Sequence, residues 1–317
     1  MKFFKKPYVF ALLFTFVLTA VSLFIILDTF IFAKEYRPET RADIYNSTTS
    51  RKSEPVTGPV TGTVTEGAGT PDPEIPAENY YSDGDVTIIL TEYREYETSI
   101  YVADVRISNI IYLKSAFAKS VYGKNVTETV SEMAENSGAV LAVNGDYYGA
   151  QRRGFVIRNG VIYRAAPYSR DREDLVVYSD GSFGIVTEGS TDVSTLIRNG
   201  ALQVYSFGPA LIDSGKIAVD ESDEVKHAME SNPRTAIGII EPLHYVFVVS
   251  DGRTEESRGL TLFELANFME ELGAETAYNL DGGGSSAMYF KGRIVNFPTD
   301  GTTAGERRVS DIVYIGY

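Results

Sequence analysis

The chain of 317 residues contains no cysteine and only two histidines. Without a thiol it forms no disulfide, no thiolate nucleophile and no cysteine-ligated metal site. Secreted animal domains of this size often carry disulfides, so the absence of cysteine favours a bacterial envelope protein. His227 lies in an acidic stretch and His244 in an apolar run, so neither predicts a serine–histidine pair or a metal site. Carboxylate-based chemistry is therefore the default expectation.

Positive charge is also scarce. The chain has 29 Lys and Arg against 43 Asp and Glu, which gives a formal net charge of −14. This charge argues against nucleic acid as a partner, because phosphate backbones select basic surfaces. The overall balance still allows a local basic pocket for a single phosphate group.

The longest uncharged apolar run extends from Tyr8 to Leu27, close to the ~20 residues that cross a hydrocarbon core. Lysines precede it at positions 2, 5 and 6, which predicts a cytoplasmic N-terminus. We expect cytoplasmic residues 1–7, a transmembrane signal-anchor over residues 8–33, and a C-terminal part outside the cytoplasm of a bacterial cell. A cleaved signal peptide is the alternative, although its apolar core would be roughly 7–15 residues long and followed by a small-x-small site.

Residues 34–80 differ from the segments on either side. Bulky apolar side chains are few, and proline, threonine and glycine recur in residues 55–63 and 71–76. Such a segment cannot offset the entropy lost on ordering. We therefore predict a disordered stalk over 34–80 that lifts a single domain, residues 81–317, off the bilayer.

The domain sequence predicts mostly strands. Residues 86–90 and 99–105 are rich in β-branched and aromatic side chains. Residues 158–161 contain Asn-Gly and residues 179–182 contain Asp-Gly, which tolerate the positive φ of tight hairpin turns. Antiparallel hairpins are therefore expected.

Two helices are predicted within this β-rich pattern. The first covers residues 127–136. The second begins at Thr261, which forms a capping box with Glu264, and it ends before Gly273. Together these features predict an α+β fold in which a few helices cover a strongly curved, mostly antiparallel sheet.

A short pattern occurs twice in the domain. After each predicted helix come a glycine, a short apolar strand and Asn-x-Asp, which is Asn144 with Asp146 in the first copy and Asn279 with Asp281 in the second. Residues two apart on a strand share a face, so each copy should present an amide beside a carboxylate. The repeat is either a distant duplication or chance, and it predicts a polar site at the strand ends.

A glycine-rich run follows the second copy. Gly282, Gly283 and Gly284 leave backbone N–H groups free to approach an anion, and Ser285 and Ser286 add hydroxyl donors. Asp281 adds an acid/base group or a metal ligand. A flexible hairpin loop is the alternative interpretation, but the Asn and Asp beside the run favour a function.

Other motifs are weaker when taken singly. Residues 144–148 could form an ordinary turn, and Asp251 lies in a charged turn after an apolar strand. Arg234 could clamp a phosphate bidentately or pair with a surface carboxylate. The one arginine-dense region is interpreted as a solvated face and comprises Arg152, Arg153, Arg158, Arg164, Arg170 and Arg172.

The order of these motifs resembles the phosphodiester glycosidase family. The resemblance covers roughly residues 139–317, and the segments that carry it are 144–148, 232–235, 250–253, 260–262, 279–286, 295–301 and 306–310. It implies hydrolysis of a sugar-1-phosphodiester to a free sugar and a phosphomonoester. An envelope phosphodiesterase acting on teichoic acid or phosphopolysaccharide, and a non-catalytic glycan-binding or envelope-assembly module, are the alternatives.

The resemblance also implies roles for individual residues. Its catalytic positions are Asp146, Asp251 and Asp281. Its substrate-binding positions are Asn144, Arg234, Asn279, Gly282, Gly283, Ser285 and Ser286. Arg234 and the 282–286 loop would bind the phosphate oxygens, while one of Asp146 and Asp281 acts as base or nucleophile and the other as acid or orienter. The oxygen-rich cluster could alternatively hold Ca²⁺ or Mg²⁺.

Overall fold

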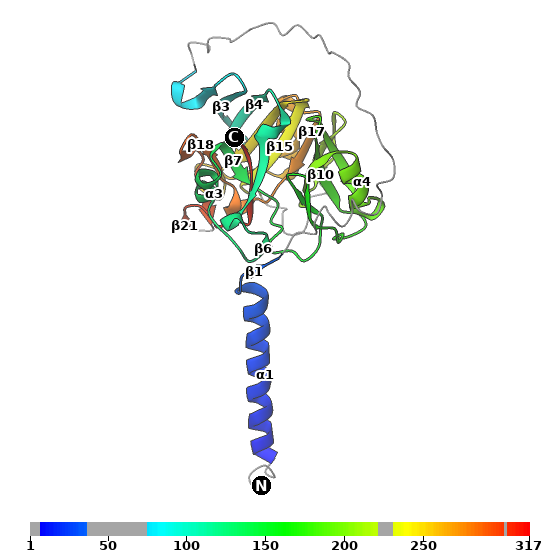
Figure 1. The fold of residues 1–317 in the computed structure, drawn as a ribbon. Coiled ribbons are helices and arrows are strands. Elements are labelled where there is room, and N and C mark those ends of the chain that lie inside the picture. The colour runs from blue at the N-terminus through cyan, green and yellow to red at the C-terminus, as the bar shows by residue number, and fades with distance from the viewer. Residues whose placement is uncertain (1–6, 37–74, 221–230, 301–302) are drawn as a thin grey trace, which may run out of the picture.

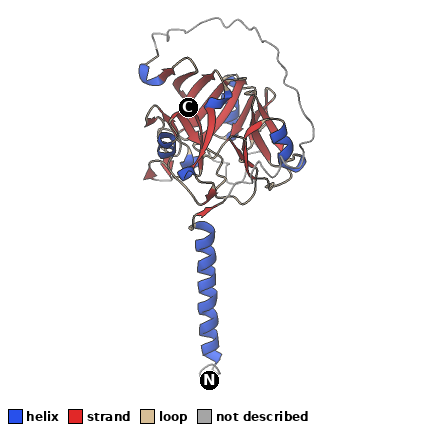
Figure 2. Ribbon diagram, in the orientation of Figure 1, coloured by secondary structure: helices blue, strands red, loops and turns tan. Residues whose placement is uncertain are grey.

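The computed structural model describes residues 7–36, 75–220, 231–300 and 303–317. Within these ranges three open sheets build the domain, and four α-helices accompany them (Figures 1 and 2). Every strand pair is antiparallel. The predicted class, mostly antiparallel sheet with a few helices, is confirmed.

The largest sheet has eight strands and contains both predicted strands, 86–90 and 99–105. In spatial order the eight strands are β14 (Lys216–Ile217), β13 (Ala210–Asp213), β17 (Thr276–Asn279), β15 (Arg234–Glu241), β16 (His244–Ser250), β4 (Thr98–Ile107), β3 (Val86–Glu95) and β2 (Tyr80–Ser82). The second copy of the Asn-x-Asp pattern therefore ends β17, near the middle of this sheet.

The second sheet has five strands and carries the first copy. Its spatial order is β19 (Arg293–Ile294), β18 (Met288–Phe290), β7 (Ala139–Asn144), β22 (Asp311–Gly316) and β5 (Leu113–Phe117). The two Asn-x-Asp copies thus leave two different sheets.

A third sheet and two short pairs complete the β structure. The third sheet is β11 (Phe183–Thr187), β10 (Glu173–Tyr178), β12 (Ala201–Tyr205), β8 (Val156–Arg158) and β9 (Val161–Arg164). The short pairs are β1 (Lys34–Glu35) with β6 (Gly123–Lys124) and β20 (Thr299–Asp300) with β21 (Thr303–Ala304). Both predicted hairpin turns are confirmed, since residues 158–161 join β8 to β9 and residues 179–182 join β10 to β11.

The α-helices are α1 (Pro7–Phe30), α3 (Val130–Asn136), α4 (Val193–Arg198) and α5 (Leu262–Glu271). The short 3₁₀ turns are η2 (Ala77–Asn79), η3 (Ile110–Tyr112), η4 (Ala118–Ser120), η5 (Glu188–Ser190) and η6 (Gly283–Ser285). The capping box of Thr261 is confirmed, and Thr129 forms a second one. Because Thr129 is the N-cap, α3 begins at Val130 rather than at residue 127 as predicted.

The main core lies between the first and second sheets. Val86, Ile88 and Leu90 of β3 point into it, as do apolar residues of β7, β18 and β22. On the other face of the first sheet, α5 packs over apolar residues of β4, β15 and β16, and α3 covers the second sheet. The central strands are therefore apolar on both faces, and polar side chains gather where strands end.

The N-terminal segment forms a helix that overlaps the predicted signal-anchor, residues 8–33. Helix α1 covers Pro7–Phe30 and projects from the domain in Figure 1 with its large apolar side chains exposed. It is long and apolar enough to span a bilayer, which fits either a signal anchor or a signal peptide.

The predicted stalk is wrong at both of its ends. Residues 34–35 form β1 against the domain, and residues 77–80 form η2 and the start of β2. Backbone hydrogen bonding to the domain orders these ends in spite of their composition, which is why composition alone misjudged them. The middle of the predicted stalk, residues 37–74, lies outside the described residues, as does His227.

Candidate active site

The two Asn-x-Asp copies meet at the end of the main core. The side chain of Asn144 donates a hydrogen bond to the backbone oxygen of Asp281 (2.6 Å), and the backbone N–H of Asp281 donates to the oxygen of Gly145 (3.1 Å). The Asn144 amide oxygen accepts from Thr235 Oγ1 (2.8 Å) and from the Ala287 N–H (3.3 Å). Asn144 therefore joins β7 to β15 and to both ends of the glycine-rich run.

A loop of residues 206–209 connects the two copies on another side. The Ser206 N–H donates to Oδ2 of Asp146 (2.8 Å). The Asn279 side chain donates to the oxygen of Gly208 (2.8 Å), and its backbone N–H donates to the oxygen of Pro209 (3.2 Å). Asp146 and Asn279, 133 positions apart in sequence, are thus fixed by one short loop.

Within each copy the Asn and the Asp bond to different partners. Strand β7 ends at Asn144, so Asp146 lies in the loop beyond it, where its carboxylate accepts from Arg158 and Ser206. Strand β17 likewise ends at Asn279, before Asp281. The predicted side-by-side arrangement assumed that each strand continues to its Asp, and the strands end too early for that assumption to hold.

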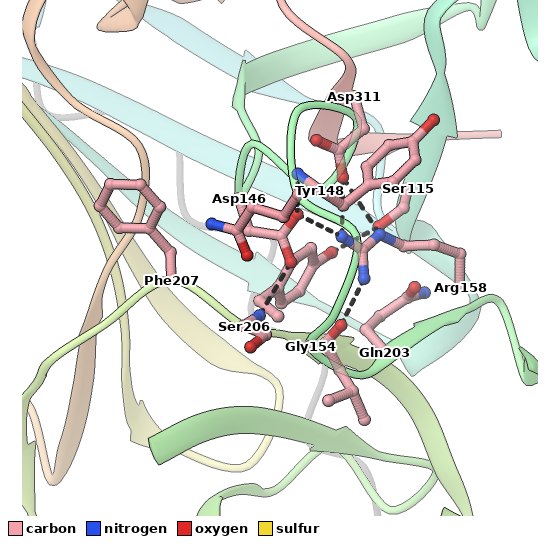
Figure 3. Close-up of polar contacts among 12 residues, drawn as sticks. Ser115, Asp146, Tyr148, Gly154, Arg158, Gln203, Ser206, Phe207 and Asp311 are labelled. Atoms are coloured by element: carbon pink, nitrogen blue, oxygen red, sulfur yellow. Dashed lines mark hydrogen bonds and ion pairs between the residues drawn. The ribbon is translucent and has the colours of Figure 1, made fainter. Parts of the chain in front are cut away.

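Arg158 is buried between two carboxylates (Figure 3). Its Nη2 lies 2.9 Å from Oδ1 of Asp146 and 2.8 Å from Oδ2 of Asp311, and its Nε donates to the same oxygen of Asp311 (3.1 Å). Nη1 donates to backbone oxygens, and the guanidinium lies 4.4 Å from the ring centre of Tyr205. Burial raises the pKa of the Asp311 carboxyl, with Asp146 adding to this shift and Arg158 opposing it.

This position contradicts the interpretation of the arginine-rich region as a solvated face. Arg158 is only 2% exposed and Arg164 donates to three backbone oxygens, whereas Arg152 and Arg153 are exposed. A buried cation is stable here because the fold brings two carboxylates to it, one of them 153 positions away.

The glycine-rich run passes between two arginines. A Cβ on Gly282 would lie 2.9 Å from the Pro233 oxygen and 3.9 Å from Cδ of Arg234. Gly283 has a φ of +61°, and a Cβ there would lie 3.0 Å from Nη2 of Arg253. Only glycine allows so close an approach at Gly282 and so favourable a φ at Gly283. The backbone of the run is therefore held beside two cationic side chains.

Asp281 lies at the start of this run, and its side chain is partly exposed to solvent. Burial raises the pKa of its carboxyl to about 6, while Ser285 and the N–H of Gly282 oppose the shift. The Gly282 N–H donates to Oδ1 of Asp281 at 2.9 Å. A carboxyl with this pKa can take up or release a proton near neutral pH.

Several buried polar atoms around the site have no hydrogen-bond partner among the described residues. They include Oδ1 of Asn279, Oγ of Ser286 and Oδ1 of Asp311. Buried polar atoms of this kind are costly unless a ligand or water satisfies them. Asn279 and Ser286 flank the glycine-rich run, which supports a polar ligand there.

Asp251 follows β16 and is 5% exposed. Its Oδ1 accepts from the Phe297 N–H (2.7 Å) and from the side chain of Asn296 (3.2 Å), whose Oδ1 in turn accepts from the Met288 N–H (2.8 Å). Burial raises the pKa of Asp251. The contacts of this carboxylate hold the chain after β19 against the end of the glycine-rich run.

A cleft of about 450 Å³ adjoins the 206–209 loop. Its lining includes Phe207, Gly208 and Pro209 of this loop together with Tyr168, Asp171, Arg172 and Glu173. The Arg172 guanidinium lies 4.6 Å from the ring centre of Tyr168, and its Nε has no hydrogen-bond partner among the described residues. The cleft offers aromatic surface and a cation next to Asn279.

Metal ligands do not gather in the described part of the chain. No group of three or more His, Cys, Asp or Glu side chains there is arranged to hold an ion. A Ca²⁺ or Mg²⁺ ion would have to rely on amide and carbonyl oxygens for most of its ligands.

The family model described as phosphodiester glycosidase matches residues 137–316, more than half of the chain. The chain belongs to the phosphodiester glycosidase family. The matched range contains both Asn-x-Asp copies, Arg158, Arg234, the glycine-rich run and Asp311.

Several curated proteins and solved structures are similar to the chain. The SPbeta prophage-derived uncharacterized protein YomE of Bacillus subtilis (strain 168) is 30% identical over 203 residues, 62% of this chain and 31% of that protein. N-acetylglucosamine-1-phosphodiester alpha-N-acetylglucosaminidase of Bos taurus is 29% identical over 207 residues, 59% of this chain and 38% of that enzyme. The chain thus spans about a third of the length of these curated relatives.

The fold is similar to the zebrafish catalytic domain of the same enzyme, which was solved auto-inhibited by its pro-peptide. That likeness has a TM-score of 0.59 at 21% identity and covers 74% of this chain and 83% of the other. A hypothetical protein from Synechocystis gives a TM-score of 0.50 at 16% identity, covering 73% and 62%. At these identities the likeness establishes the fold alone.

Sequence reasoning missed three residues of the candidate site. The sequence places Arg158 in a solvated face, does not single out Asp311, and includes Arg253 only within the segment 250–253. A usable signal existed for the first two: Arg158 follows Val156 and Ile157, and Asp311 begins an apolar C-terminal strand. A charge attached to a buried strand needs a partner.

Proposed function

We propose that this protein hydrolyses the glycosidic bond of a sugar-1-phosphodiester, giving a free sugar and a phosphomonoester. Family membership supports this bond type. The observation that carries the proposal is the meeting of the two Asn-x-Asp copies at a glycine-rich run flanked by Arg234 and Arg253. This arrangement combines a titratable carboxyl with groups that bind an anion.

The phosphate would bind at the glycine-rich run. The proposed donors are Arg234, Arg253 and the hydroxyls of Ser285 and Ser286. The N–H groups of Gly282 and Gly283 hold the run in place, because they donate to Oδ1 of Asp281 and to the Pro233 oxygen. Arg234 is 6% exposed and is oriented by a hydrogen bond from Nε to the oxygen of Leu260 (2.9 Å). Donors fixed in this way stabilise the charge that the leaving phosphate gains as the bond breaks.

Asp281 is the proposed general base. In the reaction a water oxygen bonds to the anomeric carbon, the bond from that carbon to the phosphate oxygen breaks, and the phosphate leaves with the electron pair. Asp281 accepts the proton released by the water. A pKa of about 6 keeps this carboxyl mostly ionised at neutral pH.

Asp146 and Asp251 are proposed as positioning residues for this reaction. Among the described residues, the Asp146 carboxylate is bound by Arg158 and by the N–H groups of Ser206 and Tyr148. Asp251 fixes the segment at Asn296 and Phe297. The sugar would lie in the cleft lined by Phe207 and Tyr168, where Asn279 fixes Gly208 of the lining loop. Asn144 would position the start of the glycine-rich run.

We further propose that α1 remains in a bacterial cell membrane and holds the domain outside the cytoplasm. The lysines that precede the helix favour a cytoplasmic N-terminus. The substrate would then be a sugar phosphodiester or a phosphate-containing glycan of the envelope.

The proposal is tested by a product assay on the full chain in detergent. The substrates are UDP-GlcNAc and a synthetic α-GlcNAc-1-phosphodiester, each with and without a chelator. Free GlcNAc that disappears in Asp281→Asn is expected. GlcNAc-1-phosphate instead would indicate a phosphodiesterase, and glycan binding without turnover would indicate a binding module. Activity lost only with chelator would indicate a metal ion.

A further inference from the structure

A second cleft, of about 620 Å³, lies at the base of the domain beside the end of α1. Its lining combines the chain just after the helix with β6 and the loop before β8. Four cationic side chains and one carboxylate line it, in a protein whose formal net charge is −14: Lys34, Lys124, Arg152, Arg164 and Asp28. Here we call it the basal cleft.

The basal cleft is built by a fixed attachment of the helix to the domain. Strand β1 pairs antiparallel with β6, with the backbone of Lys34 opposite that of Lys124. The Tyr36 N–H donates to the oxygen of Tyr122 (2.8 Å). The Asn125 side chain donates to the oxygen of Phe32 (3.2 Å). A Cβ on residue 123 would lie 2.2 Å from the Lys34 oxygen, so only Gly123 permits this pairing.

The cationic groups of the basal cleft are incompletely neutralised. Asp28 pairs with Lys34 at 2.7 Å. Lys124 is only 7% exposed, and neither it nor Arg152 forms an ion pair with a described residue. Arg164 uses Nε and Nη1 for backbone oxygens, whereas its Nη2 is buried without a partner in the described structure. Four cationic side chains thus share one carboxylate, Asp28, and two of the cationic groups, Lys124 and Nη2 of Arg164, are buried. An anion that enters the basal cleft would therefore be stabilised.

The position of the basal cleft relative to the membrane indicates which anion it would bind. Asp28 belongs to the last turns of α1, whose apolar span ends at this residue. If α1 crosses the bilayer as proposed above, the basal cleft lies at the level of the lipid headgroups, and Figure 1 shows β1 and β6 directly beside that end of the helix. Basic residues at this level attract anionic headgroups. We propose that the basal cleft binds the phosphate of an anionic lipid headgroup and thereby holds the domain on the membrane surface.

The proposal is tested by native mass spectrometry of the full chain released from detergent. Wild-type protein is mixed with phosphatidylglycerol or with phosphatidylcholine, whose quaternary amine the basal cleft should repel. We expect retained phosphatidylglycerol and little phosphatidylcholine. The double variant Lys124→Gln with Arg152→Gln should weaken phosphatidylglycerol binding by about ten- to thirtyfold. Each basic residue near the headgroups strengthens binding by a factor of roughly three to five, and the two factors multiply.

The matched control removes two charges elsewhere, by Arg198→Gln with Lys216→Gln, two positions that do not line the basal cleft. It should bind lipid like the wild type. The exposed Arg152→Gln alone provides a smaller change if the double variant melts early. All variants should hydrolyse a soluble phosphodiester normally if the proposed function holds, so failure of either proposal can be distinguished.

Three results would overturn the inference. One is unchanged phosphatidylglycerol binding in both Arg152→Gln and the double variant. Another is equal retention of phosphatidylcholine. The third is full displacement of the lipid by an equal concentration of soluble glycerol phosphate, which would make a free phosphate ester the ligand.

Discussion

The two Asn-x-Asp copies are alike in sequence and differ in surroundings. Asp146, in the first copy, is 1% exposed and is saturated by Arg158 and two backbone N–H groups. Asp281, in the second copy, is partly exposed, has a raised pKa and begins a run of glycines. The first copy, Asp146 with Arg158, therefore serves as a structural framework, and below we call it the framework. The second copy, Asp281 with the glycine-rich run, has the properties of a substrate-binding site, and we call it the receiving site. The same three-residue pattern can serve either purpose, depending on what the rest of the chain brings to it.

The largest expected effect comes from removing the cation of the framework. Arg158→Met should lower the free energy of unfolding by about 3–5 kcal/mol at pH 7, because two buried carboxylates lose their counter-charge. The loss should shrink at pH 5, where the Asp311 carboxyl, whose pKa is raised by burial, can be protonated. Urea denaturation at both pH values measures it. The exposed Arg198→Met should change stability by less than about 0.5 kcal/mol; an equally small effect at Arg158 would contradict the framework role.

Asp281→Asn tests the receiving site. Activity should fall by about 10²–10⁴, the usual contribution of a general base, while thermal melting stays close to that of the wild type. As a base, Asp281 acts when ionised, so wild-type kcat/KM should rise as the pH increases through about 6. A profile that instead falls through this pH would assign the carboxyl to acid catalysis.

Asp174 is a buried carboxyl that belongs to neither Asn-x-Asp copy, and it tests what burial costs a carboxyl that has no ion pair with another described residue. It is fully buried on β10, and burial, with Glu188 adding to the effect, raises its pKa to about 9. The unfolded value is about 3.9, so the native state binds the extra proton and stability falls as the pH rises from about 4 to 9. Asp174→Asn should therefore raise the free energy of unfolding at pH 8 by roughly 1–3 kcal/mol, with little gain at pH 4.

Urea denaturation across this pH range checks the prediction for Asp174. The exposed Asp213→Asn is the control and should leave the pH dependence of stability unchanged. A loss of stability in Asp174→Asn at pH 8 would mean that the carboxylate is paired there.

Substitutions at two glycines with positive φ distinguish a loss of substrate binding from a loss of stability caused by backbone strain. Gly283 and Gly292 have φ of +61° and +89°, and nothing lies within 4 Å of a Cβ on Gly292. Alanine at either position should cost about 1–2 kcal/mol of stability. Only Gly283→Ala should raise KM, by roughly tenfold, because its Cβ meets Arg253. Equal KM values for the two variants would remove Gly283 from the site.

The smallest expected effect is that of Arg253→Gln. Its guanidinium is exposed and bonds to the side chain of Asn232 at 2.8 Å. An exposed charge contributes modestly, so KM should rise about three- to fivefold at low salt and less at high salt. Steady-state kinetics at two ionic strengths measure this. No salt dependence of the difference would argue against contact with an anionic substrate.

Local features of the fold could be predicted from the sequence. The capping box at Thr261 and both hairpin turns depend on residues a few positions apart, and the structure confirms them. The repetition of Asn-x-Asp predicted a polar site at the strand ends, but not the hydrogen bonds that join the two copies. Each of these signals is contained within a short window of sequence.

Long-range features could not be predicted in the same way. The partners of Arg158 are Asp146 and Asp311, and the second is 153 positions away. The ordering of residues 34–35 depends on pairing with β6, nearly ninety positions further on. No periodicity records such pairings, because they result from the packing of one sheet against another.

The most direct test of the proposed chemistry is hydrolysis of an α-GlcNAc-1-phosphodiester in H₂¹⁸O, followed by mass spectrometry of the phosphomonoester. Attack at the anomeric carbon leaves the phosphate oxygens unchanged, so the account predicts a phosphomonoester without ¹⁸O. Incorporation of one ¹⁸O atom into it would place the attack at phosphorus and contradict the glycosidase assignment, even though the two products would have the same names.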